Sequence, residues 1–75
     1  MKRVGEVVRI AQGLAIVRCP DDDHPRLGVE VVDQNLDAVG RVVDVFGPVE
    51  RPYLAVSPDD DVTPALLVGE KLYAR

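Results

Sequence analysis

The hydrophobic residues of this chain lie in short runs that alternate with polar residues and end at glycine or proline. Between residues 3 and 10, alternate positions form the two faces of an extended strand, namely Val4, Glu6, Val8 and Ile10 against Arg3, Val7 and Arg9. The next run, Leu14–Arg18, follows Gln12-Gly13 and is too short for a stable helix. Together the two runs predict a β-hairpin.

The middle of the chain predicts an exposed loop and then a second hairpin. Residues 20–28 contain two prolines and three adjacent aspartates, which are unsuited to a strand ladder. The valine-rich runs 29–33 and 39–46 are the predicted strands, and Asn35 between them is the best candidate for a left-handed turn residue. Gly40 has no side chain to pack, so it predicts a bulge or a sharp bend at a barrel corner.

The last third of the chain predicts two more strands around one helical turn. Gly47-Pro48 ends the fourth strand, and residues 52–57 resume an extended path. After a second acidic loop, Thr63 is the expected N-cap of a helical turn that begins at Pro64. Residues 69–73 then form the predicted closing strand. Six short strands without an internal repeat predict an all-β fold, a closed six-stranded barrel that forms a single domain over residues 1–75.

Composition supports this fold class and limits the function. Valine accounts for 15 of the 75 residues, and β-branched side chains favour strands over helices. The net charge of −4 opposes unaided binding to a phosphate backbone. The single Cys19 excludes an internal disulfide, and neither an apolar leader core nor a membrane-spanning run is visible. We expect a cytoplasmic protein without direct strong RNA binding and without a membrane partner.

Catalytic and metal-binding chemistry has little support in the sequence. Cys19 and His24 are the only conceivable nucleophile and base, and no third group is placed to orient them. The aspartate triplets 21–23 and 59–61 lack the alternate spacing, turn glycine and distal glutamate of a calcium loop. We therefore predict no catalytic residue, no metal site and no cofactor, and an enzyme of any kind ranks last.

One loop is unusual for a chain of this size. In Phe46-Gly47-Pro48-Val49-Glu50-Arg51-Pro52-Tyr53, two prolines stiffen a loop that presents Val49 between two aromatic residues. Pre-organised apolar loops suit protein binding. Burial of Phe46 in the core is the alternative interpretation, whereas Val49 at the loop tip is harder to place there.

The same residues carry a resemblance to a known family. Three segments resemble the Gar family (Gar-one), in its short archaeal form, namely residues 40–49, which end in Phe-Gly-Pro-Val, then Pro52-Tyr53, and finally Leu67-Val68-Gly69-Glu70-Lys71-Leu72-Tyr73. Members of this family are subunits of box H/ACA pseudouridylation ribonucleoproteins. The resemblance is strong over the last half of the chain and extends to the first half only in strand pattern.

The resemblance implies a split barrel like that of a translation-factor domain, and a non-catalytic accessory role. Such a subunit binds the catalytic domain of a TruB-like pseudouridine synthase. It meets the guide RNA only indirectly and promotes loading and release of substrate RNA in guide-directed pseudouridylation of rRNA, a step of ribosome biogenesis. Carried over to this sequence, the partner-binding or loop-shaping candidates are Phe46, Gly47, Pro48, Val49, Pro52 and Tyr53.

Two other binding modules remain open. The run 31–44 also looks like the hairpin of a PRC-barrel adaptor in ribosome maturation. A small RNA-binding barrel would need a basic face, for which the candidates are Arg3, Arg9, Arg18, Arg41 and Arg51, but three aromatic residues near strand ends are too few for a stacking platform.

Overall fold

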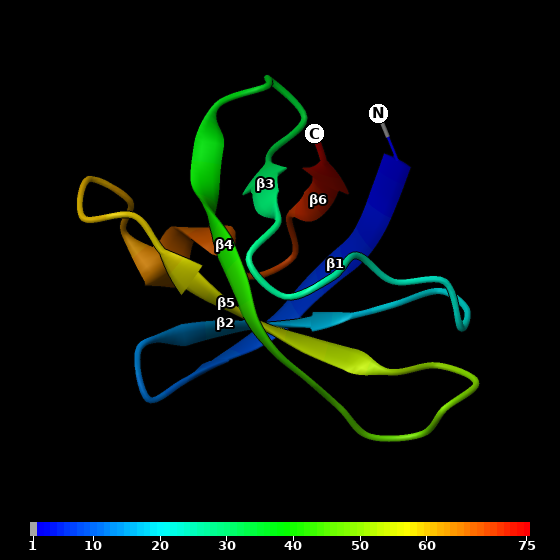
Figure 1. Ribbon diagram of the computed structural model, residues 1–75. Coiled ribbons are helices and arrows are strands. Elements are labelled where there is room, and N and C mark those ends of the chain that lie inside the picture. The colour runs from blue at the N-terminus through cyan, green and yellow to red at the C-terminus, as the bar shows by residue number, and fades with distance from the viewer. Residues whose placement is uncertain (1) are drawn as a thin grey trace.

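The predicted hairpins and the closing strand join edge to edge into a closed antiparallel barrel (Figure 1). The computed structural model describes residues 2–75, so Met1, the first residue of the predicted domain, lies outside them. The strands are β1 (Lys2–Ala11), β2 (Leu14–Arg18), β3 (Glu30–Val32), β4 (Ala38–Phe46), β5 (Tyr53–Pro58) and β6 (Lys71–Ala74), with a 3-10 helix, η1 (Pro64–Leu67), before β6. Around the barrel they run in the order β1-β2-β5-β4-β3-β6. The all-β class and the six-stranded barrel are confirmed.

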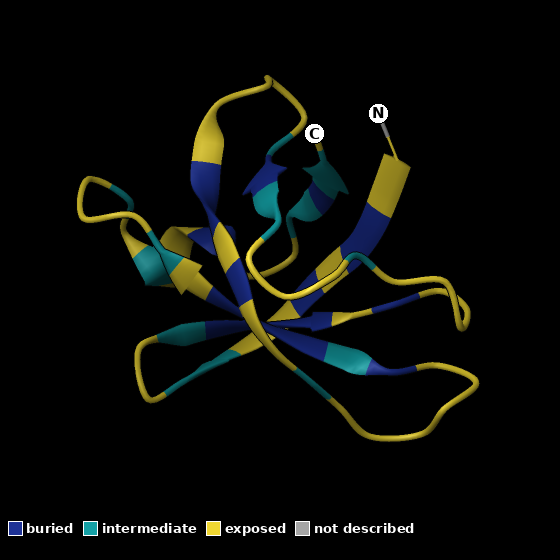
Figure 2. Ribbon diagram, viewed as in Figure 1, coloured by how far each residue is buried: buried dark blue, intermediate teal, exposed yellow. Residues whose placement is uncertain are grey.

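The barrel interior is filled mainly by small β-branched side chains. Figure 2 shows buried and exposed residues along the strands, whereas the connecting loops are mostly exposed. No charged or polar residue within 2–75 is buried. The buried hydrophobic residues include Val4, Val7, Val17, Val31, Val39, Val42, Val56, Leu54, Leu72, Ala15 and Cys19.

The inward face of β1 differs from the predicted one. Val4 and Val7 are buried, whereas Val8 is 40% exposed. The register of β1 shifts between Arg3 and Gly5 against β6, and again between Val7 and Arg9 against β2. Each bulge inserts an extra residue and reverses the alternation beyond it. The predicted grouping of Val4 with Val8 is therefore wrong.

Two glycines permit the backbone of a neighbouring strand to approach closely. A Cβ atom on Gly5 would collide with the backbone carbonyl of Arg18, and one on Gly40 with that of Ser57. The register of β4 against β3 also shifts beside Gly40, between Val31 and Val32. The bulge predicted at Gly40 is confirmed by this shift, and only a residue without a side chain fits there.

The β3–β4 turn corrects a second prediction. The left-handed residue is Leu36, with φ of 68°, and not Asn35. The Asp33 carboxylate accepts hydrogen bonds from the backbone N–H groups of Asn35 (2.8 Å) and Asp37 (3.0 Å). This carboxylate holds the first part of the turn in place, and the reversal falls one residue later.

The helical turn begins at Pro64 with Thr63 as its N-cap, as predicted, but it is a 3-10 turn. The Thr63 side chain makes no capping hydrogen bond. Instead, the Thr63 carbonyl accepts the N–H of Leu66 at 3.0 Å. Leu67, the buried residue of η1, belongs to the hydrophobic core. No helix within residues 2–75 has the length and apolarity needed to cross a membrane.

Candidate partner-binding surface

The loop of residues 47–52 joins β4 to β5 and is held at both ends. Gly47 adopts φ of 88°, a left-handed conformation that favours glycine, and so turns the chain away from β4. The Arg51 N–H donates to the Pro48 carbonyl at 3.3 Å, which closes a turn with Val49 and Glu50 at its tip. The Cys19 N–H donates to the Pro52 carbonyl at 3.0 Å and fastens the loop to the end of β2. Its shape is therefore set by the barrel.

An aromatic pair forms the base of this loop. Phe46 and Tyr53 are register partners on β4 and β5, and their rings stack with centroids 5.7 Å apart and planes 20° apart. Such pairs stabilise by about 0.5–1.5 kcal/mol beyond the burial of their area. Phe46 nevertheless stays 38% exposed, so it lies at the surface and outside the core cluster.

Beyond the pair, the loop presents apolar surface to solvent. Val49 is 82% exposed, the largest exposed fraction among the big hydrophobic residues within 2–75. A hollow of about 280 Å³ lies between this loop and the 19–29 loop. Its lining is Val45, Phe46, Gly47, Pro48, Val49 and Pro52 on one side, with Asp22 and His24 on the other.

The structure brings all six predicted residues together, but they differ in how far they are buried. Pro52 is buried and Tyr53 is half-buried, whereas Gly47 and Pro48 are exposed. Pro52 and Gly47 shape the loop, while Val49, Pro48 and Phe46 are exposed on it. Sequence reasoning did not place Asp22 and His24 beside them, because the two loops are far apart in the chain.

The other chemical candidates are separated from each other. Cys19 is buried, and His24 is exposed with its Nδ1 at 2.9 Å from the Pro25 carbonyl oxygen. The two residues line different pockets. In the part of the chain that the structure describes, no three His, Cys, Asp or Glu side chains converge on a metal-sized site.

The Cys19 thiol is held in its neutral form. Burial raises its pKa, and the nearby negative charge of Asp21 raises it further. A nucleophilic cysteine needs the opposite change, because the thiolate is the reactive form. Cys19 therefore serves packing beneath the loop.

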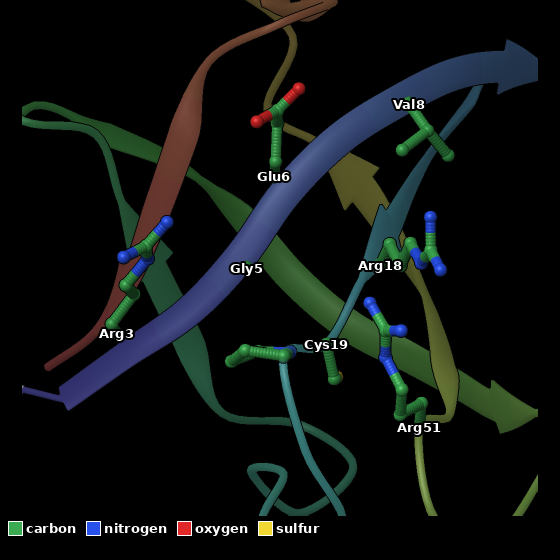
Figure 3. A pocket seen from close by; sticks show the side chains of 8 residues that line it. Arg3, Gly5, Glu6, Val8, Arg18, Cys19 and Arg51 are labelled. Carbon is green, nitrogen blue, oxygen red and sulfur yellow. The ribbon is translucent and has the colours of Figure 1, made fainter.

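A second pocket contains three of the five arginines that the sequence offered as candidates for a basic face. Arg3 of β1, Arg18 at the end of β2 and Arg51 of the 47–52 loop line a hollow of about 240 Å³ (Figure 3). Cys19 and Pro20 also line it. The register pair Arg18–Tyr53 brings Arg18 near the loop that carries Arg51. Arg9 and Arg41, the other two arginines of the predicted flank, do not line it.

Comparison with known proteins identifies the family. The model of the "Gar1/Naf1 RNA binding region" matches residues 1–75. An uncharacterized protein of the archaeon Methanothermobacter thermautotrophicus is 32% identical over 77 residues, which cover 97% of this chain and 82% of that protein. The solved structure of the Gar1 domain of Naf1 superposes with a TM-score of 0.73 over 99% of this chain and 81% of that one, at 14% identity, and so supports the fold.

These matches decide between the two adaptor interpretations, because the match covers the whole chain and favours the Gar-like one over the PRC-barrel one. Proteins of the matched family are accessory components of ribonucleoproteins and are not known as enzymes. Their particles are the box H/ACA ribonucleoproteins of rRNA pseudouridylation. This chain belongs to the Gar1/Naf1 family.

Proposed function

We propose that the chain is a non-catalytic accessory subunit of a box H/ACA ribonucleoprotein and binds the catalytic domain of a TruB-like pseudouridine synthase. The contact surface is the exposed apolar part of the 46–53 segment, namely Phe46, Pro48 and Val49. The supporting observation is the 82% exposure of Val49 on a loop held by Gly47, the Pro48–Arg51 turn and the Cys19–Pro52 hydrogen bond. A loop that is ordered before binding loses little conformational entropy on association.

In this proposal the subunit assists turnover and leaves the chemistry to the synthase. It promotes loading of substrate RNA and release of product, in the cytoplasm, and it meets the guide RNA through the complex. Family membership supports the ribonucleoprotein setting. The net charge of −4 supports weak RNA binding by the chain alone.

Binding is tested by copurification with a TruB-like synthase and by Val49→Glu. A carboxylate buried without a partner at an interface costs several kcal/mol, so we expect the dissociation constant to rise about a hundredfold or more. Val68→Glu is the matched control, because Val68 is also an exposed valine (52%) but lies beyond η1, outside the loop. Equal losses in the two variants, or tight binding by Val49→Glu, would place the interface elsewhere.

The role in turnover is tested with a reconstituted synthase and guide RNA. Adding the wild-type chain should speed multiple-turnover pseudouridylation far more than a single turnover, because product release and loading limit only the former. Val49→Glu should lose this difference. Equal acceleration of single and multiple turnover would instead indicate that the chain helps to assemble the catalytic site.

The family description also names RNA binding. Tight, salt-sensitive binding of guide RNA by the isolated chain in a gel-shift experiment at physiological salt would favour an RNA-binding barrel over the accessory subunit proposed here. We expect no shifted band under these conditions, because three aromatic residues and a negative net charge provide little stacking or counterion release.

A further inference from the structure

A second surface of the barrel concentrates positive charge. The pocket of Arg3, Arg18 and Arg51 lies on a protein whose net charge is −4, and all three side chains are exposed. These residues come from β1, from the end of β2 and from the 47–52 loop. Folding thus collects three separated cations at one place.

None of these arginines takes part in an ion pair within the part of the chain that the structure describes. The ion pairs found among residues 2–75 join Lys2 to Asp23 and Arg75 to Glu30. Glu6 also lines the pocket and is the register partner of Arg18, but Figure 3 shows its carboxylate directed away from Arg18 and Arg51, while the Arg51 side chain extends toward Arg18. The lining therefore keeps an excess of positive charge, with three arginines and one glutamate. Like charges held together repel, so an anion bound between them relieves that repulsion.

The arrangement fits an extended, repeating anion. Figure 3 shows Arg3 on one side of Gly5 and the Arg18–Arg51 pair on the other, so a ligand that meets all three must pass over β1 at Gly5. Guanidinium groups match the paired oxygens of phosphate. The lining contains no aromatic residue for base stacking, so it offers contacts to the backbone of a nucleic acid and none that read its sequence.

We propose that Arg3, Arg18 and Arg51 bind the phosphate backbone of RNA without sequence preference. This inference goes beyond the proposed function and takes from it only that RNA is near the protein in its particle. Three phosphate contacts give weak binding to the chain alone, detectable at low salt and lost at physiological salt. Within the particle they hold a strand that other subunits have already placed.

The test is an NMR titration of the whole chain with a short oligouridylate at several salt concentrations. The backbone amides of Gly5, Arg18, Cys19 and Arg51 should shift. Replacing two of the cations, as Arg18→Gln with Arg51→Gln, should weaken binding roughly tenfold at low salt. It should also reduce the slope of log K against log salt by about 1.4, the value for two contacts to single-stranded RNA.

The matched control is Arg26→Gln with Arg41→Gln, which changes the net charge equally but lies outside the pocket. We expect less than a twofold effect from this pair of substitutions. Equal weakening by the two double variants would show that only the overall charge matters and would overturn the proposal. So would a glutamate-rich peptide that shifts the same amides at lower concentration than the oligouridylate, since the pocket would then be an acidic-protein site.

Failure of this proposal and failure of the proposed function can be told apart. Val49→Glu should retain the oligouridylate shifts while losing the synthase, and the Arg18/Arg51 double glutamine variant should retain the synthase. If either variant lost binding to both the oligouridylate and the synthase, the two ligands would share one surface. This result would contradict a separate RNA site.

Discussion

The barrel wall and the 47–52 loop use glycine in different ways. In the wall, Gly5 and Gly40 occupy places where a neighbouring backbone carbonyl leaves no room for a Cβ atom. In the loop, Gly47 adopts a positive φ that favours glycine, and the atom nearest to an added Cβ would belong to the Tyr53 ring. The wall therefore tolerates almost no change at its corners, whereas the loop can exchange surface residues while the barrel stays folded. Partner contacts are expected where substitution costs the fold least.

Gly40→Ala is the substitution with the largest expected effect on stability, and it tests this contrast most directly. The added methyl group meets the Ser57 backbone, which is fixed by strand pairing, so we expect a loss of about 3 kcal/mol or more in the free energy of unfolding. Urea denaturation measures it. Gly13→Ala is the control, because Gly13 has φ of 77° but nothing within 4 Å of its Cβ position. If both variants lose the same stability, the close approach at Gly40 does not limit the fold.

A smaller effect is expected for Gly47→Val at the root of the loop. Left-handed backbone costs a β-branched residue about 1–2 kcal/mol, and the Tyr53 ring lies 3.0 Å from the new Cβ. Thermal melting should fall by roughly 10 °C. Gly69→Val shares φ of 88° but has nothing within 4 Å, so it isolates the backbone strain. An unchanged melting temperature in Gly47→Val would contradict the assigned conformation.

Cys19, which lies between the barrel wall and the loop, is expected to make the stability of the fold depend on pH. Burial, and then the charge of Asp21, raise its pKa in the folded protein above the ordinary 9.0. The unfolded thiol therefore ionises first, and its contribution to stability is complete below about pH 9 and lost as the pH rises through the folded pKa. The melting temperature of wild type should fall more between pH 8 and pH 10 than that of Cys19→Ala. Parallel curves would show that the thiol is not protected.

The smallest effect on stability is expected for Val49→Glu. An 82% exposed side chain contributes little to folding, so the free energy of unfolding should change by no more than about 0.5 kcal/mol. Its large effect on synthase binding would then be a property of the interface. A melting temperature lowered as far as in Gly47→Val would mean that the loop tip belongs to the fold.

The architecture was largely predictable because valine content, turn residues and strand lengths point to the same answer. The strand at 14–18 and the bulge at Gly40 were found in this way. The inward face of β1 was not, because a bulge depends on how two strands pair, and the sequence of one strand alone does not show this. Leu36 was missed for a similar reason, since the Asp33 carboxylate decides where the turn reverses.

The 46–53 loop and the arginine pocket also differ in how far the sequence alone could reveal them. The 46–53 loop is continuous in sequence, so its prolines, aromatic residues and exposed valine could be recognised together. The arginine pocket is assembled from positions 3, 18 and 51, and only strand order brings them together. Counting alternate positions could not separate them from Arg9 and Arg41, because bulges in β1 and β4 change the direction of the side chains on these strands.

Closure of the barrel by the first and last strands has a consequence for how the protein folds. Lys2 is the register partner of Ala74, so β1 and β6 join residues from the two ends of the described chain, which also lie at the same end of the molecule in Figure 1. Contacts of such sequence separation carry a large loop-closure entropy, and topologies rich in them fold slowly. During synthesis the β1–β2 hairpin can form early, but one edge of β1 stays unpaired until β6 has left the ribosome. Until then that edge is open to pairing with other chains.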